Sequence, residues 1–293
     1  MQINSYAKIN FFLYIGPERS DGFHEIFSLF APVNFSDIMD IETIDDKCCH
    51  IEMECDASFS EAQLKALDIP VEQNLVYRAW NIYPSDQRKG LNIRLKKNIP
   101  PGGGLGGGSS NAAAVLTFLN QNADTPLSHT ELSKLAAQLG SDVPFFLTGQ
   151  PGLSSGRGEI IEPFPFKTRY HVVLIIPNFT ISTKWAYANV KIDLTPQKKQ
   201  NILYKLCSYG LSRSIQDFDN SFRELLEQEH DFYRITRATM LDAGALLAIP
   251  SGSGSTMFGV FDEKCKAEAA MERLAQNRAI LTELKLGHAT EGL

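Results

Sequence analysis

The sequence predicts an α+β fold in two domains, residues 1–162 and 163–293, and three observations support this prediction. Strand-like apolar runs and stretches of helical periodicity occur in both parts of the chain. The 293 residues are enough for two modest domains. The proline-punctuated stretch EPFPFK, at 162–167, separates the two mixed regions and therefore favours a boundary there.

The first domain is expected to begin with strands and to continue with helices. Apolar runs or polar alternation predict strands at 7–15, 24–35, 37–44 and 91–99, and helical periodicity predicts helices at 74–83, 110–121 and 128–139. Ser109 or Ser110 is placed to cap the second of these helices. The acidic residues between Asp37 and Asp46 are interpreted as a solvated strand face followed by a turn.

The helix at 128–139 has signals at both ends. Ser128 and Glu131 have the S-x-x-E spacing of a capping box, and Gly140 stands where a helix ends. A further short element is expected at 141–147, with Pro144 near its start.

The second domain is expected to mix short strands with longer helices. The pattern predicts strands at 170–177, 245–250, 256–261 and 280–287, and helices at 197–209, at 217–243 in two pieces and at 263–276. The stretch SGSGS, residues 251–255, lies between the second and third of these strands. The segment 191–243 contains no functional motif that we can interpret.

Composition excludes several classes of function. The formal net charge of −6 disfavours a nucleic-acid or anionic membrane partner, since both need a basic surface. No apolar run approaches the roughly 20 residues of a membrane span, and the N-terminus lacks the apolar core of a signal peptide. The cysteines form no CxxC pair, and Cys48, Cys49 and His50 have no second ligand pair at a zinc-like spacing. We therefore expect a cytoplasmic protein with reduced thiols and no metal centre of its own.

The most unusual stretch of the sequence is a glycine-rich turn. Every residue from Gly102 to Gly108 except Leu105 is glycine, and a helix-forming run follows directly. Without side chains, backbone N–H groups can converge on an anion, and the N-terminus of the following helix adds partial positive charge. Phosphate binding is therefore the leading interpretation. A flexible linker is disfavoured, because Pro100 and Pro101 end the preceding strand and an apolar helix follows.

Three common nucleotide-binding loops do not fit this turn. A P-loop needs a lysine after its last glycine, whereas Ser109 follows Gly108. Gly102, Gly104 and Gly107 satisfy G-x-G-x-x-G, but the preceding strand is half polar, unlike the buried strand of a dinucleotide-binding fold. A protein kinase needs HRD and DFG triplets, and neither occurs.

Several stretches, in order along the chain, resemble the GHMP kinase superfamily, which comprises galactose, homoserine, mevalonate and phosphomevalonate kinases. PPGGGLGGGSSNAAAV resembles its second motif, and SGSGSTMFGVF resembles its C-terminal glycine motif. AKINFFLYI followed by DGFHEI resembles the N-terminal motif of one family within it, the kinases of 4-diphosphocytidyl-2-C-methyl-D-erythritol. GSDVPFFLTG, GRGEIIEPF and ISTKWAY also fall where that family has them, so the resemblance covers nearly the whole chain.

This resemblance implies a two-domain GHMP kinase fold, with an N-terminal ATP-binding domain and the active site in the inter-domain cleft. It also implies a reaction in the non-mevalonate isoprenoid pathway, in which ATP phosphorylates the 2-hydroxyl of 4-diphosphocytidyl-2-C-methyl-D-erythritol. Two rival functions stay open at this point. One is another GHMP-type kinase acting on mevalonate, homoserine or a sugar, and the other is a nucleotide sensor without turnover. The sequence does not predict an oligomeric state.

The resemblance implies two catalytic residues, Asp142 and Lys8. Asp142, in GSDVP, matches the catalytic aspartate of the family, which takes the proton of the acceptor hydroxyl. Lys8, in AKIN, matches the active-site lysine, which keeps the aspartate ionised and stabilises developing negative charge. Each has a structural alternative: Asp142 is also placed to cap the element that begins at Val143, and Lys8 also fits the solvent-facing side of a strand.

The resemblance further implies a set of ATP contacts. The glycine turn would wrap the triphosphate, and Asn74 and Lys97 match positions that border the adenosine. Alternatively, Lys97 only solubilises the end of a strand. Ser110 could reach Mg²⁺, although the ion is expected to be held mainly by phosphate oxygens and water. The expected ATP contacts are Asn74, Lys97, Pro101, Gly102, Gly103, Gly104, Leu105, Gly106, Gly107, Gly108, Ser109, Ser110 and Asn111.

Five residues match the substrate pocket of the family: Asn10, Phe23, His24, Thr183 and Tyr187. A cytosine ring would stack between Phe23 and Tyr187, with its edge read by His24 and the hydroxylated tail bound by Asn10. Core packing is the alternative for the two aromatic residues, and a surface position is the alternative for His24. The family commonly has tyrosine at the position of Phe23, so stacking is retained here and a phenolic hydrogen bond is lost.

Overall fold

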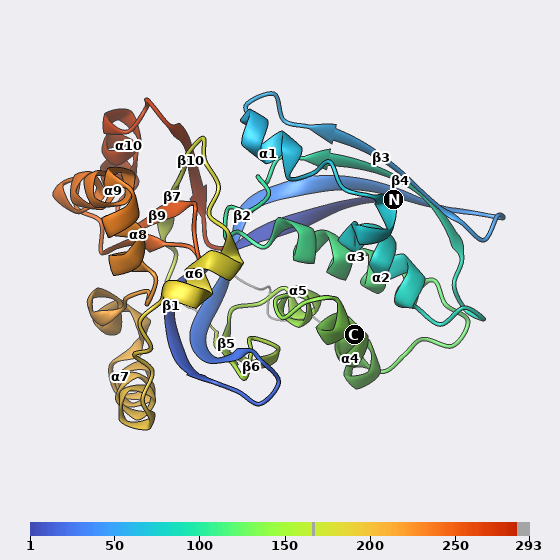
Figure 1. Ribbon diagram of the computed structural model, residues 1–293, viewed down its shortest axis with the longest axis horizontal. Helices are drawn as coiled ribbons and strands as arrows, with labels where there is room; N and C mark the ends of the chain where they lie inside the picture. The colour runs from blue at the N-terminus through green and yellow to red at the C-terminus, as the bar shows by residue number, and fades with distance from the viewer. Residues whose placement is uncertain (166–167, 286–293) are drawn as a thin grey trace. The chain divides into compact units, whose positions relative to one another are not determined.

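Two long strands near the N-terminus, β1 (Gln2–Glu18) and β2 (His24–Ile44), each contribute residues to both of the compact units into which the structure divides. The structure is a computed structural model, and it describes residues 1–165 and 168–285 (Figure 1). The first unit comprises residues 1–7, 35–101 and 106–149, and the second comprises residues 8–34, 102–105 and the described residues from 150 onward. Each unit mixes helices with strands, which confirms the predicted α+β class.

The first unit is a sheet covered by helices. Besides its parts of β1 and β2, its elements are β3 (Cys49–Cys55), α1 (Glu61–Lys65), the 3-10 helix Val71–Gln73, α2 (Leu75–Ile82), β4 (Gly90–Lys97), α3 (Gly107–Gln121), α4 (His129–Leu139) and α5 (Val143–Thr148). β2 pairs with β4 antiparallel, from Ile38 opposite Lys96 to Ile44 opposite Gly90, and β3 pairs with β4 parallel. A parallel pair needs a crossover connection, which α1 and α2 supply here.

Alternation of side chains along β2 and β4 creates the core of the first unit. Met39 and Ile41 of β2 and Leu91, Ile93 and Leu95 of β4 are buried on the same side of the sheet as apolar residues of α2, α3 and α4. Figure 1 shows α2 and α3 along one face of these strands. This packing holds α3, whose first residues, Gly107 and Gly108, are the last two of the glycine turn.

The second unit contains two sets of paired strands. Its elements after β2 are β5 (Gly152–Ser155), β6 (Ile160–Pro163), β7 (His171–Ile176), α6 (Thr183–Asn189), α7 (Pro196–Ser214), the 3-10 helix Ile215–Asp217, α8 (Arg223–Glu229), α9 (Asp231–Asp242), β8 (Leu247–Pro250), β9 (Met257–Phe261), α10 (Lys264–Arg273) and β10 (Arg278–Glu283). One antiparallel set has the order β10-β7-β9-β8. In the other, β2 pairs with β1, Ser28–Phe30 of β2 pair antiparallel with β5, and β5 pairs antiparallel with β6.

The sheet β10-β7-β9-β8 supports a second glycine-containing turn. β7 is a continuous apolar run from Val172 to Ile176 that is buried on both faces, and α9 and α10 pack against this sheet. Residues 251–256, which we call the 251–256 turn, join β8 to β9. The turn is therefore carried by two buried, hydrogen-bonded strands.

Several predicted elements are confirmed, including the helix with signals at both ends. In α4, the Ser128 hydroxyl accepts the N–H of Glu131 at 3.3 Å, and the Glu131 carboxylate accepts the N–H of Ser128 at 2.9 Å. Gly140 is the C-cap, as predicted. The prediction that Ser109 or Ser110 caps α3 is wrong, because the helix begins earlier, at Gly107, with Gly106 as its N-cap.

Other elements were not predicted, and some predictions cannot be compared with the structure. Strands β3, β5 and β6 and helices α1 and α6 are short or half polar, so they have no strong periodic signal. Phe166 and Lys167 of EPFPFK, and Leu286 and Gly287 of the last predicted strand, lie outside the described residues. The domain limits 1–162 and 163–293 stay a prediction. Within the described ranges, no helix combines the length and apolar character needed to cross a bilayer.

Candidate active site

Residues 102–105, the part of the glycine turn in the second unit, have all four carbonyl groups hydrogen-bonded. Three of the donors belong to the 251–256 turn, and the fourth is a backbone N–H of β1. The bonds, at 2.9 or 3.2 Å, run from Ser255 N to Gly102, from Thr256 N to Gly103, from Ser251 Oγ to Gly104 and from Lys8 N to Leu105. Among the described residues, none accepts a hydrogen bond from the N–H groups of 102–105. The arrangement therefore immobilises the carbonyls and leaves the N–H groups for a ligand.

The backbone conformation explains why this turn is rich in glycine. Gly102, Gly104 and Gly106 have φ values of 68°, 72° and 71°, in the left-handed region that residues with a Cβ rarely adopt. Gly104 is also in close contact with the 251–256 turn: a Cβ at this position would lie 1.9 Å from the carbonyl oxygen of Ser251. A side chain at Gly104 is excluded by both conformation and space.

The start of α3 adds a second group of backbone donors. Gly106, at the N-cap, makes no side-chain capping bond, so the N–H groups of the first turn have no side-chain acceptor at the cap. Such a helix N-terminus, in a helix of 15 residues, favours an anion. Ser110 is buried in this first turn, and its N–H donates to the carbonyl of Gly106 at 2.9 Å.

Asp37, Lys97 and Asn111 form a buried polar cluster in the first unit. The Lys97 ammonium pairs with one carboxylate oxygen of Asp37 and donates to Asn111 Oδ1 at 3.0 Å. The Asn111 amide donates to the same Asp37 oxygen at 3.0 Å, and the other oxygen accepts the N–H groups of Asn98 and Ile99 at 2.8 Å each. Asp37 is 0% exposed and Lys97 is 4% exposed. The prediction that Asp37 is solvated is therefore wrong, and so is the alternative that Lys97 only solubilises a strand end.

This cluster connects the end of β4 to the first turn of α3. Lys97 and Asn111, two of the expected ATP contacts, use their side chains to hold that geometry. Since Asp37 accepts from both of them, it organises the cluster. A direct contact of either residue with ATP stays a prediction.

We expect Asp37→Asn to lower the free energy of unfolding by about 3–5 kcal/mol, because it leaves the Lys97 ammonium buried without a counter-charge. Urea denaturation measures this loss. Asp40→Asn, at an exposed position of the same strand, is the matched control and should change stability by less than about 0.5 kcal/mol. The double variant Asp37→Asn/Lys97→Met should recover part of the loss, and equal stability of Asp37→Asn and the control would contradict the assigned ion pair.

Lys8 lies buried in the second unit with its ammonium directed at Asn10. Its Nζ donates to Asn10 Oδ1 at 2.7 Å, and the same oxygen accepts the N–H of Gly252 at 2.9 Å. The ammonium also lies 5.0 Å from the ring centroid of Phe30. Because Lys8 is only 3% exposed, the alternative of a solvent-facing strand lysine is wrong. The fold thus brings together Lys8, Asn10 and the 251–256 turn.

Asp142 and Asn74 both occupy N-cap positions in the first unit, with different consequences. Asp142 precedes α5 with φ −82° and ψ −15°, and its side chain makes no capping hydrogen bond. The Asp142 carboxylate therefore does not serve as the helix cap. Asn74 does cap α2, because its Oδ1 accepts the N–H of Val76 at 2.9 Å. Its contact with adenosine stays a prediction.

Aromatic side chains gather near the hairpin that joins β1 to β2. Phe23 is 47% exposed, and the guanidinium carbon of Arg157 lies 4.9 Å from its ring centroid. The rings of His24 and Tyr187 are 5.8 Å apart, and His24 Nδ1 lies 2.9 Å from the carbonyl oxygen of Gly16. The core-packing alternative is therefore wrong for Phe23, and His24 and Tyr187 are half-buried neighbours.

The hairpin position of Phe23 is fixed by its neighbours. Hydrogen bonds from the Arg19 guanidinium hold the pKa of Asp21 below its usual value, so this carboxylate stays ionised. Asp21 Oδ1 in turn accepts the N–H of Phe23 at 3.2 Å. Thr183, another expected pocket residue, lies with its hydroxyl 3.2 Å from that of Ser253, in the 251–256 turn.

The expected site residues are divided between the two units. The first unit contains Asn74, Lys97, Pro101, Gly106, Gly107, Gly108, Ser109, Ser110, Asn111 and Asp142, and the second contains Lys8, Asn10, Phe23, His24, Gly102, Gly103, Gly104, Leu105, Thr183 and Tyr187. Within the first unit, the contacts described above bring Lys97 together with Asn111. Within the second, they join Lys8 and Asn10 to the 251–256 turn and His24 to Tyr187.

Comparison with known proteins adds family information to this geometry. The model of the GHMP kinases N terminal domain matches residues 74–150, and that of the GHMP kinases C terminal domain matches residues 211–279. The 4-diphosphocytidyl-2-C-methyl-D-erythritol kinase of Chlorobium chlorochromatii is 34% identical over 280 residues, which cover 94% of this chain and 93% of the relative. That of Nitratidesulfovibrio vulgaris strain Hildenborough is 36% identical over 281 residues, with coverage of 93% and 94%.

The chain belongs to the 4-diphosphocytidyl-2-C-methyl-D-erythritol kinase family. Its fold also matches a crystal structure of 4-(cytidine 5'-diphospho)-2C-methyl-D-erythritol kinase with a TM-score of 0.75 at 30% identity, covering 98% of this chain and 100% of that chain. A homoserine kinase from Cytophaga hutchinsonii matches with a TM-score of 0.70 at 17% identity, which establishes a shared fold alone. The resemblance found in the sequence is thus confirmed at the level of family and fold.

Within this kinase family fold, three polar residues near the expected site residues were not predicted from the sequence. Asp37 organises the cluster with Lys97, and the Ser251 hydroxyl holds the carbonyl of Gly104. Asn220 donates to two carbonyls of the residues around Ser251. The alternation of β2 contains a signal for Asp37, and Ser251 begins the stretch SGSGSTMFGVF, whereas nothing local in the sequence distinguishes Asn220 from an ordinary turn residue.

Proposed function

We propose that this chain transfers the γ-phosphoryl group of ATP to the 2-hydroxyl of 4-diphosphocytidyl-2-C-methyl-D-erythritol, giving the 2-phosphate and ADP. The observation that carries this proposal is the 33–36% identity, over nearly the whole chain, to relatives that bear the name of this kinase. The reaction is a step of the non-mevalonate isoprenoid pathway. A nucleotide sensor without turnover is disfavoured, because both residues expected to act in catalysis are present.

The proposal gives proton transfer to Asp142 and charge stabilisation to Lys8. Asp142 is assigned the hydroxyl proton because it matches the catalytic aspartate of the family and a carboxylate can act as a general base. Lys8 is held by Asn10 in a buried position, so its positive charge is oriented before the reaction begins. Phosphoryl transfer depends mainly on such positioning and charge stabilisation, since the protein has little covalent chemistry to perform.

The proposal places the triphosphate of ATP on backbone donors. The N–H groups of 102–105, whose carbonyls are occupied, and those of the first turn of α3 are suited to phosphate oxygens. Asn74 and Lys97 are proposed to border the adenosine, and Mg²⁺ is proposed to enter with ATP on its phosphate oxygens. The cluster of Asp37, Lys97 and Asn111 would then keep the first turn of α3 in a fixed position.

On the acceptor side, the proposal uses the residues around the β1–β2 hairpin. The exposed ring of Phe23 offers a stacking surface for cytosine, and Tyr187, close to His24, offers a second ring. Asn10 and Thr183 would bind the hydroxylated or diphosphate portion. Their positions beside the 251–256 turn support this assignment.

An acceptor comparison tests the proposed function. The purified chain is incubated with ATP, Mg²⁺ and one acceptor at a time, and ADP release is followed with 4-diphosphocytidyl-2-C-methyl-D-erythritol, mevalonate, homoserine and galactose. We expect turnover with the cytidine compound alone, and ³¹P NMR of the product should place the new phosphate on the 2-hydroxyl. Turnover with another acceptor and none with the cytidine compound would refute the proposal.

We expect Phe23→Ala to raise the KM for the cytidine substrate by about tenfold or more, because one base–aromatic stack is worth about 1–3 kcal/mol. The KM for ATP should change little. Phe23→Tyr, which keeps the ring, is the matched control and should retain the wild-type KM for both substrates. Equal increases in both KM values for Phe23→Ala would place this residue outside the cytidine pocket.

We also propose that the protein acts in the cytoplasm. All five cysteines are free thiols, and two of them, Cys207 and Cys265, are exposed. Exposed free thiols are typical of proteins in a reducing compartment. The proposed partners are the two small-molecule substrates, without nucleic acid or membrane.

A further inference from the structure

Asn220 lies at the centre of a buried hydrogen-bond network in the segment 191–243, for which the sequence suggested no role. It belongs to the residues 219–223, which we call the 219–223 turn and which precede or begin α8. We propose that Asn220 is a positioning residue: by fixing the 251–256 turn it sets the position of the Lys8 ammonium. The proposal deepens the function given above and rests on it.

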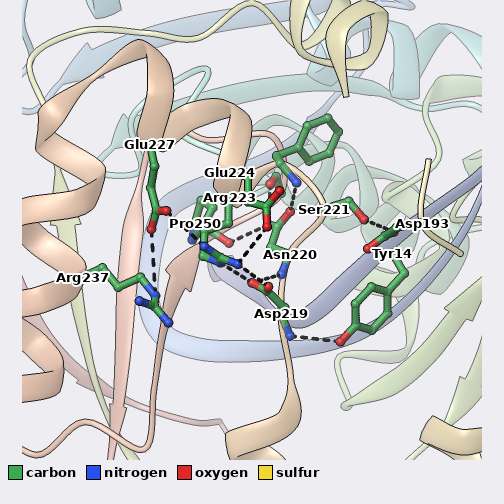
Figure 2. Close-up of polar contacts among 12 residues, drawn as sticks. Tyr14, Asp193, Asp219, Asn220, Ser221, Arg223, Glu224, Glu227, Arg237 and Pro250 are labelled. Carbon is green, nitrogen blue, oxygen red and sulfur yellow. Dashed lines mark hydrogen bonds and ion pairs between the residues drawn. The ribbon is translucent and has the colours of Figure 1, made fainter. Parts of the chain in front are cut away.

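The side chain of Asn220 is almost fully committed to hydrogen bonds. It is 2% exposed, and its Nδ2 donates to the carbonyls of Pro250 and Gly252 at 2.8 Å each. Its Oδ1 accepts the N–H of Phe222 at 2.9 Å. Two carbonyls facing one nitrogen leave only one orientation for the amide, because a rotated amide would direct an acceptor at two acceptors. Figure 2 shows the Asn220 side chain beside Pro250.

The two carbonyls that Asn220 holds flank the point where the 251–256 turn contacts the expected site residues. Between them, the Ser251 hydroxyl donates to the carbonyl of Gly104. Also between them, the N–H of Gly252 donates to Asn10 Oδ1, the same oxygen that accepts from Lys8 Nζ. A continuous series of buried hydrogen bonds therefore leads from Asn220 through Gly252 and Asn10 to Lys8.

The series is fixed at its other end as well. The Asn10 amide donates to the Ser28 hydroxyl at 2.9 Å, and that hydroxyl donates to the carbonyl of Phe12 at 2.6 Å. Asn10 Oδ1 thus cannot exchange places with Nδ2 without losing several bonds. Asn10 Oδ1 accepts hydrogen bonds from the Gly252 N–H and from Lys8 Nζ. A shift of the Gly252 N–H would remove the first bond and leave the position of this oxygen, and therefore of the Lys8 ammonium, less fixed.

The 219–223 turn is itself firmly held. The Arg223 guanidinium donates to both carboxylate oxygens of Asp219, at 2.7 and 2.8 Å, and to Glu227 at 3.0 Å, as Figure 2 shows. This fork geometry is the strong form of an arginine–carboxylate pair. The backbone of Leu13, in β1, donates to the carbonyl of Asp219 at 3.0 Å and accepts the N–H of Ser221 at 2.8 Å. The turn is therefore attached to the same strand that carries Lys8 and Asn10.

Phe222, also in the 219–223 turn, contacts a residue of the proposed cytidine pocket. Phe222 is fully buried, and its ring lies edge-on to that of Tyr187 with centroids 5.0 Å apart. The N–H of Phe222 is the group that orients Asn220 Oδ1. The 219–223 turn thus contacts both the Lys8 network and an aromatic residue assigned to the substrate.

A double-mutant cycle between Asn220 and Lys8 tests this inference. The rate of ADP release is measured at saturating substrates for wild type, Asn220→Ala, Lys8→Met and the double variant, with single-turnover measurements for the slow ones. We expect Asn220→Ala to lower kcat about a hundredfold in the wild-type background, since a displacement near 1 Å can cost that much. In the Lys8→Met background it should lower the rate less than about threefold, because residues that act as a unit are not additive.

A purely structural role would give a different result. Loss of general stability lowers the active fraction equally in both backgrounds, so an equal fold-change with and without Lys8 would overturn the proposal. A change of less than about threefold in the wild-type background would also overturn it. Asn201→Ala, at an exposed position of α7, is the matched control and should leave the rate unchanged.

Two further variants cover the case in which Asn220→Ala does not fold. Asn220→Asp keeps the shape and turns a donor into an acceptor, and Arg223→Lys keeps the charge of Arg223 while losing its bidentate bonds to Asp219. Each should lower kcat, with the same dependence on Lys8. If the wild-type chain phosphorylates a different acceptor in the comparison above, the proposed function fails while the cycle, run with that acceptor, still decides this inference. A chain that phosphorylates none of the acceptors overturns both.

Discussion

Asp142→Asn should lower kcat by about 10²–10⁴-fold, the range expected when a general base is lost, and should leave ATP binding nearly intact. The substitution keeps the size of the side chain and removes its ability to take a proton. Because Asp142 makes no side-chain capping bond, the substitution removes no helix cap from α5, and the melting temperature measures the loss of any other contact of the carboxylate. Steady-state ADP release and calorimetric titration with a non-hydrolysable ATP analogue measure the two effects.

The control for this prediction is another carboxylate of the same unit. Asp124→Asn removes an exposed acid in the loop between α3 and α4 and should leave both kcat and ATP binding unchanged. Near-normal kcat for Asp142→Asn would show that another group takes the proton. A parallel loss of ATP binding would indicate a structural role instead.

Gly104→Ala should lower kcat/KM for ATP by about a hundredfold or more, because a displaced turn no longer directs its N–H groups correctly. The new Cβ would lie 1.9 Å from the carbonyl oxygen of Ser251 and 2.9 Å from that of Gly254, so the backbone has to move. The φ of 72° adds strain of roughly 1 kcal/mol or more. Kinetics over a range of ATP concentrations, together with thermal melting, separate the two effects.

Gly210→Ala is a closely matched control, because Gly210 has a φ of 71° and nothing within 4 Å of the position of its Cβ. It should carry strain from its positive φ, here combined with a ψ of 175°, without a collision. We expect a modest loss of stability and wild-type kinetics with ATP. If both alanine variants lose activity equally, backbone strain alone accounts for the effect, and the close contact between Gly104 and Ser251 does not contribute to activity.

The glycine turn could be predicted from the sequence because its signal is local. A dense run of glycines directly before an apolar helix has few other uses, so the turn and the helix were both predicted correctly. The exact start of α3 was not, because Gly106 begins the helix in a left-handed conformation and makes the serines part of the first turn. Capping preferences alone therefore placed the N-cap three or four residues too late, at Ser109 or Ser110 instead of Gly106.

Asp37 in β2 was predicted to be solvated, although the alternation of side chains along the strand places it on the buried side. Asp37 lies two residues before Met39, so strict alternation places it on the buried side of the strand. In the register of β2 and β4, Ile38 lies opposite Lys96, and one further step brings Asp37 opposite Lys97. Opposite charges on the inner faces of paired strands predict an ion pair, but only once the register is known. The many acidic residues between Asp37 and Asp46 led instead to the prediction of a solvated strand face.

The role of Asn220 could not have been predicted from the sequence. Its hydrogen bonds reach residues 30 and 32 positions away, and nothing in the adjacent residues indicates which carbonyls it will meet. Similarly, the pairing of Thr183 with Ser253 spans 70 positions. Polar contacts of this kind depend on the tertiary arrangement, whereas capping boxes and glycine turns depend on a few neighbouring residues.

The second unit is built from segments that lie far apart in the sequence, and this affects when the unit can fold during synthesis. Leu13 pairs with Asn220, and Val33 pairs with Leu284, so segments that are synthesised early are completed by segments that are synthesised much later. On the ribosome, the apolar residues of β1 and of early β2 must wait for these partners while most of the polypeptide is still being synthesised. The second unit is therefore expected to fold only after β10 has been synthesised, and a chain that ends before β10 should leave this unit unfolded and prone to aggregate.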